Sequence, residues 1–118
     1  MAAKDDLGRR GEDLAARFLE ASGYTVIDRN WRCARGEIDL VARDGSDTVF
    51  VEVKTRSSTA FGHPFEAITT QKLARLKRLA IAWTQSHPYR RGAIRIDAIA
   101  VIATAGEQPR IEHLRRVF

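Results

Sequence analysis

Apolar residues near the beginning of the chain recur at the spacing of an amphipathic helix. Asp5 or Asp6 can cap its first turn, and Gly23 can adopt the left-handed conformation that ends a helix. We therefore predict a helix that ends just before Gly23. The residues on its apolar face are Leu7, Gly11, Leu14, Ala15, Phe18 and Leu19.

The next three apolar segments show the two-residue repeat and the β-branched content of strands. They cover residues 24–31, 36–43 and 48–55. The second and third flank Asp-Gly-Ser-Asp, a strong turn signal between apolar runs, so we expect them to form a hairpin. An edge position suits the first strand.

The second half of the chain predicts one more helix and two strands. Pro88 and Gly92 end the helix, and the strand after it is apolar on both faces except at Arg95 and Asp97, as in a central strand. The predicted order is helix, three strands, helix, strand and a weak last strand, in one domain over residues 1–118. The sequence thus indicates an α/β fold with a mixed sheet and a helix on each face. The segments are a loop over 56–64, a helix over 67–83 with Leu73, Leu76, Ala80 and Trp83 buried, and strands over 94–102 and 110–117.

Composition narrows the class of protein. The 118 residues are 44% apolar and 30% charged, which is typical of one globular domain. No apolar run has the length of a signal peptide or a membrane span, so we expect a cytoplasmic protein without membrane contact. Cys33 is the only cysteine, which excludes an intrachain disulfide and a cysteine-based zinc site.

The net charge of +5 is unevenly distributed along the chain. Residues 1–53 hold 8 Lys/Arg and 11 Asp/Glu, whereas residues 54–118 hold 12 Lys/Arg and 4 Asp/Glu. The second half therefore has an excess of positive charge that favours a polyanionic partner, although a solvated surface gives the same composition.

Charged residues interrupt the apolar pattern of the two hairpin strands. If Asp44 pairs with Asp47 across the turn, Asp39 lies opposite Glu52, and Glu37 lies opposite Lys54. Facing carboxylates repel each other, so Asp39 and Glu52 need a cation or a proton between them. This register puts Glu37, Asp39, Val41, Phe50, Glu52 and Lys54 on one face and Ile38, Leu40, Val51 and Val53 on the other.

Two interpretations of these charges remain open. Lys54 can bridge to Glu37 or Glu52, which would make the group a surface ion-pair ladder. Alternatively, the carboxylates hold a divalent ion, and an all-oxygen ligand set selects Mg²⁺ or Mn²⁺ over Zn²⁺. Such an ion can activate a water for phosphodiester hydrolysis, with Lys54 stabilising the developing charge.

The chain resembles the YraN-type family of small uncharacterised bacterial proteins in three segments: GRRGEDLAARFLEASGYTVIDRNWR, GEIDLVARDG and FVEVKTR. That family is grouped with the restriction-endonuclease-like nucleases, whose signature is an Asp on one strand and Glu-x-Lys on the next. The spacing of Asp39, Glu52 and Lys54 is similar to that of archaeal Holliday-junction resolvases, and Glu12 matches a glutamate on their first helix.

The resemblance implies a restriction-endonuclease-like fold with an α-β-β-β-α-β core. It also implies that Glu12 joins Asp39 and Glu52 as a metal ligand, with Lys54 as a catalytic residue. Without the resemblance, Glu12 reads as an acid that favours the helix dipole. The chain departs from the signature at Ile38, which stands where a proline often precedes the Asp.

Basic residues in three segments are candidates for holding a nucleic acid, most simply DNA. Phosphate contacts by such residues give sequence-independent, salt-sensitive binding, whereas an ordinary solvated helix face has the same pattern. The candidates are Arg9 and Arg10 on the first helix, Arg56 after Lys54, and Lys72, Arg75 and Arg78 on the second helix, followed by Arg90 and Arg91.

The predicted function is a Mg²⁺- or Mn²⁺-dependent DNA endonuclease of repair or recombination, in which a homodimer would cut both strands of a junction. The alternatives are a non-catalytic nucleic-acid-binding module that acts through a partner, and a structural domain with an ion-pair ladder. In the loop over 56–64, Phe61 is a possible wedge or stacking partner for DNA, and Phe65 fits better in the core. The three histidines, His63, His87 and His113, have no mutual ligand spacing and read as surface or loop residues.

Overall fold

Two helices and a single sheet build the fold over the residues that the computed structural model describes, 4–88 and 92–118. The predicted order of helices and strands is confirmed, with one short 3-10 helix in addition. The elements are α1 (Lys4–Ala21), β1 (Thr25–Cys33), β2 (Gly36–Asp44), β3 (Asp47–Arg56), η1 (Pro64–Ala67), α2 (Thr70–Gln85), β4 (Ile94–Ile102) and β5 (Arg110–Leu114).

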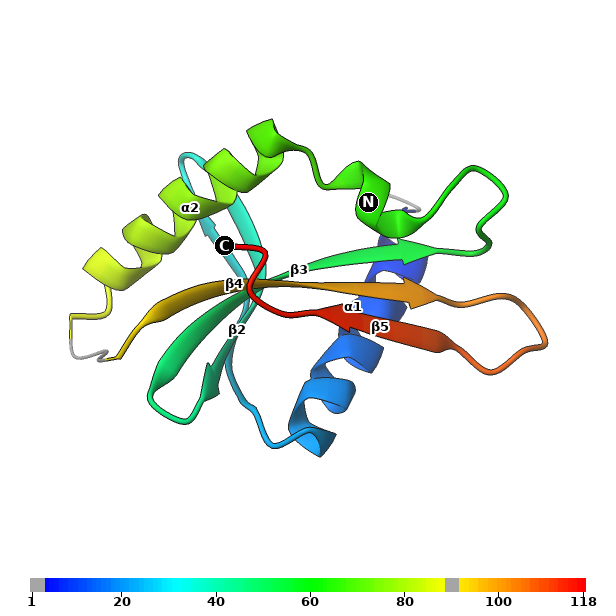
Figure 1. Ribbon diagram of the computed structural model, residues 1–118, viewed down its shortest axis with the longest axis horizontal. Helices are drawn as coiled ribbons and strands as arrows, with labels where there is room; N and C mark the ends of the chain where they lie inside the picture. The colour runs from blue at the N-terminus through cyan, green and yellow to red at the C-terminus, as the bar shows by residue number, and fades with distance from the viewer. Residues whose placement is uncertain (1–3, 89–91) are drawn as a thin grey trace.

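The five strands form one mixed sheet in the order β1-β2-β3-β4-β5. The pairs β1–β2, β2–β3 and β4–β5 are antiparallel, whereas β3 and β4 are parallel and connected through α2 (Figure 1). A parallel pair requires a crossover connection, which explains why a helix is inserted between these two strands. The first strand lies at an edge, as expected. Within the described residues, neither helix is long and apolar enough to cross a membrane.

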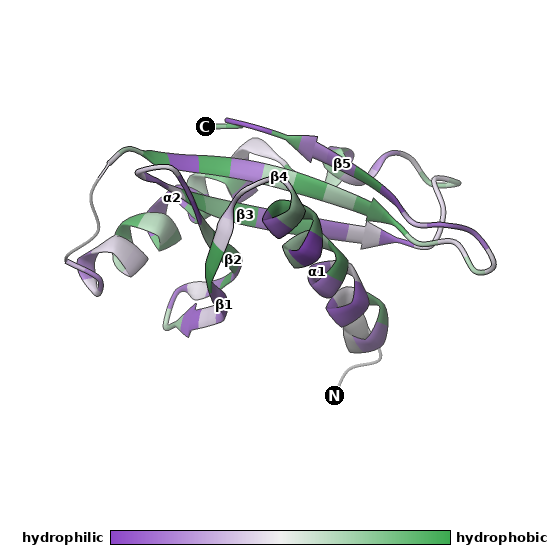
Figure 2. Cartoon of the chain, turned by 90° about the horizontal axis from the view of Figure 1, so that it is seen from below, coloured by the Kyte–Doolittle hydropathy of each residue, from purple (hydrophilic) through white to green (hydrophobic). Residues whose placement is uncertain are grey.

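The helices cover opposite faces of the sheet. Alternate residues of β3 point to opposite sides, so Val49 and Val51 pack under α1, whereas Phe50 packs under α2. On the α2 side, Phe50 meets the ring of Trp83 edge to face, with ring centroids 5.5 Å apart. Figure 2 shows β4 as apolar over most of its length, with polar bands near its beginning. The predicted apolar face of α1 and the predicted central position of β4 are both confirmed.

Several element boundaries differ from the prediction. Helix α1 begins at Lys4, so Asp5 and Asp6 lie inside its first turn instead of capping it. Helix α2 begins only at Thr70, because the Thr69 side chain accepts a hydrogen bond from the Lys72 backbone N–H and caps the helix there. The preceding residues form η1, which sequence spacing did not separate from α2. Strand β5 ends at Leu114, although the chain continues beside β4 to Phe118.

The β2–β3 hairpin has the predicted register only near its turn. Asp44 pairs with Asp47, and pairing continues to Leu40 and Val51, where it ends. The predicted pairs Asp39–Glu52 and Glu37–Lys54 are therefore wrong, because the two strands separate before reaching them. The alternation of faces also changes there: Ile38 packs with Val41 on the α2 side, not with Leu40 on the α1 side. The separation opens space at this end of the sheet.

Gly11 lets α1 approach β3 closely. A Cβ built on Gly11 would overlap the Thr55 hydroxyl and lie 2.7 and 2.8 Å from Thr55 Cγ2 and Cβ. Any larger residue at this position must push the helix away from the strand. Because Glu12 follows directly, this contact also fixes how near Glu12 comes to β2 and β3.

We expect Gly11→Ala to lower the free energy of unfolding by about 1–3 kcal/mol, because of overpacking against Thr55. Denaturant unfolding of the variant measures this effect. Gly8→Ala is the matched control, since its Cβ would meet nothing within 4 Å and alanine favours the helix. If Gly11→Ala were as stable as Gly8→Ala, the close approach would have no energetic consequence.

A buried polar network crosses the end of the sheet opposite to the separated strands. Arg95 and Asp97 of β4 are almost fully buried and form a two-bond ion pair with N···O distances of 2.9 and 3.1 Å. Arg95 also donates to Tyr24 and Asp44, at 2.6 and 3.0 Å. His113 Nε2 lies 2.7 Å from Asp97. The prediction of His113 as a surface residue is wrong, because its side chain is mostly buried in this network.

Candidate functional site

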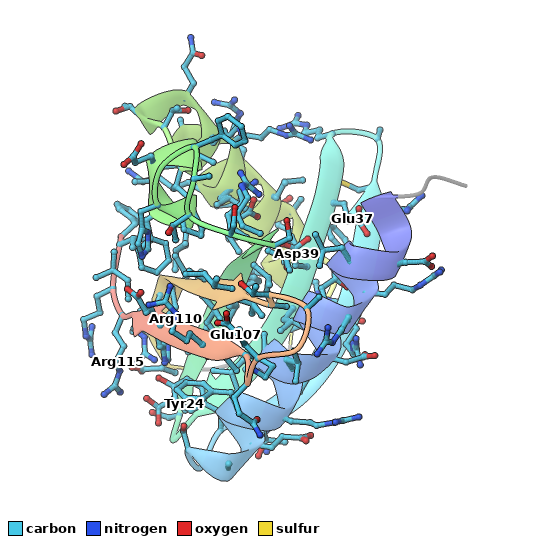
Figure 3. The ribbon with its side chains drawn as sticks, turned by 90° about the vertical axis from the view of Figure 1, so that its right-hand side faces the viewer. Tyr24, Glu37, Asp39, Glu107, Arg110 and Arg115 are labelled. Atoms are coloured by element: carbon cyan, nitrogen blue, oxygen red, sulfur yellow. The ribbon has the colours of Figure 1, made fainter. Side chains whose placement is uncertain are left out.

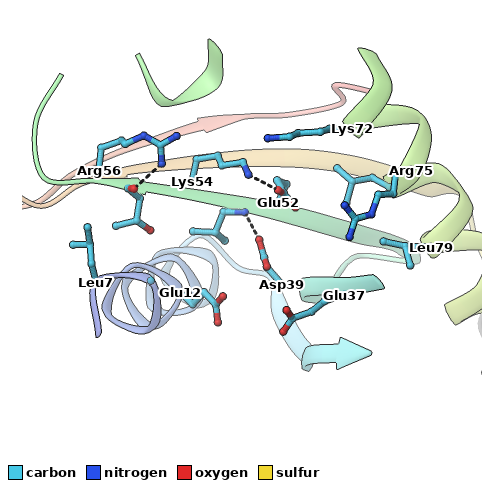
Figure 4. A pocket seen from close by; sticks show the side chains of 14 residues that line it. Leu7, Glu12, Glu37, Asp39, Glu52, Lys54, Arg56, Lys72, Arg75 and Leu79 are labelled. Atoms are coloured by element: carbon cyan, nitrogen blue, oxygen red, sulfur yellow. Dashed lines mark hydrogen bonds and ion pairs between the residues drawn. The ribbon is translucent and has the colours of Figure 1, made fainter. Parts of the chain in front are cut away.

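A cavity of about 450 Å³ lies between α1 and α2, at the end of the sheet where β2 and β3 separate (Figure 4). We refer to it as the central cavity. It collects residues from four elements, so segments far apart in the sequence supply its walls. Its lining consists of Leu7, Gly8 and Glu12 of α1, Glu37 and Asp39 of β2, residues 52–56 of β3, and Lys72, Arg75, Leu76 and Leu79 of α2.

Asp39 is held in the central cavity by the backbone of the neighbouring strand. Its Oδ2 accepts a hydrogen bond of 2.8 Å from the Val53 N–H, a group that the separated strands leave without a ladder partner. Burial, and then the nearby Glu52 carboxylate, raise the pKa of Asp39 to about 8. The Val53 bond and Lys54 oppose this shift, whereas Glu12 adds to it. The carboxyl of Asp39 thus sits among like charges in a poorly solvated place.

Glu52 and Lys54 form an ion pair on β3. Lys54 Nζ lies 2.9 Å from Glu52 Oε2, and the two side chains are only 19% and 16% exposed. Of the two bridges that the sequence allowed for Lys54, the structure contains the one to Glu52. The other candidate, Glu37, is paired differently, with its Oε2 3.5 Å from Arg32 Nε. Lys54 therefore neutralises the Glu52 carboxylate and also lies close enough to Asp39 to influence its charge.

The four predicted site residues gather at one place. Figure 4 shows the carboxylates of Glu12 and Asp39 near each other and Glu52 with Lys54 on the strand above them. Glu12 comes from the helix, and its charge contributes to the raised pKa of Asp39. Convergence occurs even though Asp39 and Glu52 are not ladder partners, since the space between the separated strands admits both side chains.

The donor set suits a hard divalent cation with few protein ligands. Among the described residues, no three His, Cys, Asp or Glu side chains form a ready-made metal-binding group. Mg²⁺ is commonly held by one or two carboxylates, with water and substrate phosphate completing its octahedron, so a complete protein cage is not needed. Asp39 and Glu52, with Glu12 nearby, fit that pattern. A cation there would also relieve the repulsion that Asp39 experiences.

The predicted basic residues divide into two groups. Arg56, Lys72 and Arg75 line the central cavity together with the acids, Arg56 at one end of it and Lys72 and Arg75 at the other (Figure 4). Arg9, Arg10 and Arg78 are exposed on their helices and are not part of its lining. Arg9 is paired with Asp6 at 3.0 Å. Arg90 and Arg91 lie outside the described residues.

Comparison with known proteins places the chain in a family. A model of the "Uncharacterised protein family UPF0102" matches residues 11–101. The chain belongs to the UPF0102 family. A UPF0102 protein of Arthrobacter sp. (strain FB24) is 58% identical over 117 residues, which is 99% of each chain. One from Beutenbergia cavernae is also 58% identical over 99% of each chain, and one from Frankia alni is 51% identical over 100% of this chain and 98% of its own.

The UPF0102 match covers the central-cavity residues from Glu12 to Leu79, whereas Arg9 and Arg10 precede it. The resemblance to a family of small uncharacterised bacterial proteins is thus confirmed at family level. The names of the family and of these relatives state no activity, so the chemistry of this UPF0102 protein follows only from its own residues.

Sequence reasoning missed how Arg75 is positioned. Gly36, the first residue of β2, has a φ of +142°, and a Cβ there would lie 2.7 Å from Arg75 Nη2. The guanidinium of Arg75 therefore lies across the Gly36 backbone, at the mouth of the central cavity. A glycine directly before the acidic segment Glu37–Asp39 was the available signal, because glycine often marks a close approach.

Proposed function

We propose that this UPF0102 protein is a metal-dependent DNA endonuclease of repair or recombination that hydrolyses phosphodiesters with Mg²⁺ or Mn²⁺. One observation carries the proposal: Glu12, Asp39, Glu52 and Lys54 line a single cavity together with Arg56, Lys72 and Arg75. Acidic ligands for a hard cation beside cations for phosphate are the groups that phosphodiester hydrolysis requires.

Each group has a role in the proposed reaction. Asp39 and Glu52 would hold the ion, assisted by Glu12. When bound, the ion supplies an activated water and neutralises charge on the scissile phosphate. The ion pair with Glu52 holds the Lys54 side chain in the site. There Lys54 would stabilise the charge that develops on the phosphate oxygens. Arg56, Lys72 and Arg75 would bind phosphates of the same strand.

The arrangement of elements supports a restriction-endonuclease-like assignment of the fold. The order α1, β1, β2, β3, α2, β4 corresponds to the α-β-β-β-α-β core of those nucleases, to which the sequence bears a resemblance. In that scheme, Asp39 occupies the strand position of the signature Asp, and Glu52-Val53-Lys54 occupies Glu-x-Lys. Fold likeness alone does not decide an activity, so the proposal depends on the chemistry of the central cavity.

A second candidate is a nucleic-acid-binding module without catalysis. One observation favours it: Lys54 already neutralises Glu52, and a proton on Asp39 would relieve the repulsion between Asp39 and the nearby Glu52 and Glu12 without a metal. Such a protein would bind DNA through Arg56, Lys72 and Arg75 in the presence of EDTA, and it would cleave no DNA under any metal condition.

Metal binding separates the two candidates before any cleavage is measured. We expect Mn²⁺ or Mg²⁺ to raise the melting temperature of the wild-type protein, by a stabilisation of about 2.7 kcal/mol when free metal is at 100 times its Kd. Glu52→Gln should lose most of this shift, because it removes one ligand charge. Glu107→Gln, an exposed acid after β4, is the control and should keep it. If neither metal changed the melting temperature of the wild-type protein, the result would count against the endonuclease.

Cleavage itself is tested on branched, nicked and single-stranded DNA with Mg²⁺ or Mn²⁺. Activity that depends on metal and on Asp39 supports the endonuclease, as argued for Asp39→Asn in the Discussion. Binding without cleavage of any of these DNAs supports the second candidate.

A further inference from the structure

Phe61 is the most exposed large apolar residue of the described chain. Its side chain is wholly in solvent, at the tip of the loop between β3 and η1, which Figure 1 shows projecting past the end of β3. A single exposed apolar residue is common on protein surfaces, so the meaning of Phe61 depends on what surrounds it. Phe65, two residues into η1 and half-buried, packs on the His63 ring with centroids 4.8 Å apart.

Both ends of this loop contact the β4–β5 edge of the sheet. At its start, the Thr104 hydroxyl donates to the Ser57 carbonyl at 2.8 Å. At its end, His63 Nδ1 accepts from the Phe65 N–H at 3.0 Å, and His63 Nε2 lies 3.0 Å from a Glu112 carboxylate oxygen of β5. Within the tip, the Gly62 N–H donates to Thr59. Several contacts therefore hold in place a loop whose tip presents an aromatic ring to solvent.

A cavity of about 390 Å³, open to solvent, lies along this loop, and Phe61 is among its lining residues although its side chain stays exposed. Its size falls within the range of roughly 300–1,000 Å³ that is usual for small-molecule sites. Arg56 lines both this loop cavity and the central cavity, so the two are neighbours along β3. The loop cavity also contains Ser57, Ser58 and one acid, Glu66, which is engaged with the His63 backbone N–H at 3.4 Å.

We propose that the loop cavity is a subsite for an unpaired nucleobase of the bound DNA strand, stacked on Phe61, with the adjoining phosphate at Arg56. The proposal rests on the proposed function only for the nature of the ligand, a nucleic-acid strand. An aromatic face, hydroxyl groups and one arginine are the groups with which proteins bind single-stranded nucleic acid. A base inside a duplex cannot reach Phe61 in this way, because its faces are covered by neighbouring base pairs. The protein therefore prefers DNA with unpaired bases beside the phosphate in the central cavity.

Binding in EDTA tests the subsite without any contribution from cleavage. Fluorescence anisotropy compares a single-stranded oligonucleotide of about 12 nucleotides with the blunt duplex of the same sequence. We expect Phe61→Ala to weaken single-strand binding by about 5- to 100-fold, which corresponds to the loss of one base stack, and to change duplex binding less than about 2-fold. Phe61→Trp should restore the single-strand affinity, because it keeps a stacking face.

Phe118→Ala is the matched control, since Phe118 is another exposed phenylalanine but lies beside Lys77 and Ile96. It should alter neither affinity. Equal weakening for duplex and single strand, no change in Phe61→Ala, or failure of the wild-type protein to bind the single strand would each overturn the subsite.

The two proposals fail in different ways. Unchanged single-strand affinity in Phe61→Ala, together with metal-dependent cleavage that Asp39→Asn removes, would overturn the subsite and leave the endonuclease intact. Single-strand binding that depends on Phe61, without cleavage by the wild-type protein, would support the subsite and remove the hydrolytic function.

Discussion

Replacing Asp39 with asparagine should reduce Mg²⁺- or Mn²⁺-dependent DNA cleavage by at least about 100-fold while the protein stays folded. The loss follows because a neutral amide is a poor ligand for a hard cation. Asparagine has the shape of aspartate, and its side-chain oxygen can still accept the hydrogen bond from Val53. It also removes a carboxyl whose charged form is disfavoured by burial and by Glu52 and Glu12, so the free energy of unfolding should be unchanged or higher.

The measurement is the initial rate of cleavage of branched, nicked and single-stranded DNA, with melting temperature as a check of folding. Glu107→Gln again serves as control, because this exposed acid lies away from the central cavity. Lys54→Ala should also lose activity, through the missing positive charge beside the phosphate. Equal rates in wild type, Asp39→Asn and Lys54→Ala would show that a contaminating nuclease produces the activity.

Replacing Asp97 with alanine should lower the free energy of unfolding by about 3–5 kcal/mol, the largest stability effect that we expect from a single substitution. The change leaves the buried Arg95 with only part of its counter-charge, from Asp44, and deprives His113 and the Arg116 N–H of their acceptor. Figure 3 shows Tyr24 and Arg115, which flank this network, well separated from Asp39. Denaturant unfolding measures the loss, and metal binding by the remaining folded protein should be unaffected.

Two controls bear on the Asp97 prediction. Asp13→Ala breaks an exposed ion pair with Arg29, of 2.6 Å, and should cost less than about 1 kcal/mol. If Asp97→Ala cost no more than Asp13→Ala, the buried network would not contribute to stability in the way argued.

Asp97 also causes the free energy of unfolding to fall at low pH. Burial by itself would raise the pKa of Asp97, but hydrogen bonds from His113, Arg95 and the Arg116 backbone outweigh it and lower the pKa to about 2. Because the folded pKa lies below the unfolded value of 3.8, the contribution is fully present above about pH 4 and is lost as the pH falls through 2. Unfolding free energies measured from pH 5 to pH 2 should fall by about 2 kcal/mol more in wild type than in Asp97→Asn.

The hairpin shows how far the sequence could be taken. The Asp-Gly-Ser-Asp turn and the alternation of Val49, Phe50 and Val51 determine the register, and the observed pairs agree with it up to Leu40 and Val51. Where the ladder ends depends on a side chain taking the place of a strand: Asp39 accepts the Val53 N–H that a paired strand would use. The periodicity of apolar residues does not show where a side chain replaces a strand as hydrogen-bond acceptor. The separation of the two strands was therefore not predicted.

Other differences come from contacts between distant segments. Arg95 and Asp97 stood out in an apolar strand, but their partners are the residue before β1, the last residue of β2 and a residue of β5. Spacing along the chain could not bring Tyr24, Asp44 and His113 together. Asp39, Glu52 and Lys54 could be chosen in advance because they are charged residues in apolar strands, and the resemblance added Glu12. The roles assigned to them remain predictions.

The parallel pairing of β3 with β4 has a consequence for how the chain folds. Thr48 is aligned with Ile94, so this contact forms only after the whole intervening segment has closed into a loop. The antiparallel pairing of β3 with β2 needs no such closure, and it brings Asp39 and Glu52 onto adjacent strands early. The slowest step of folding should therefore be the arrival of β4 together with the helix that carries Lys72 and Arg75. A chain caught before that step would have Asp39, Glu52 and Lys54 on their strands without the two basic residues that α2 adds to the central cavity.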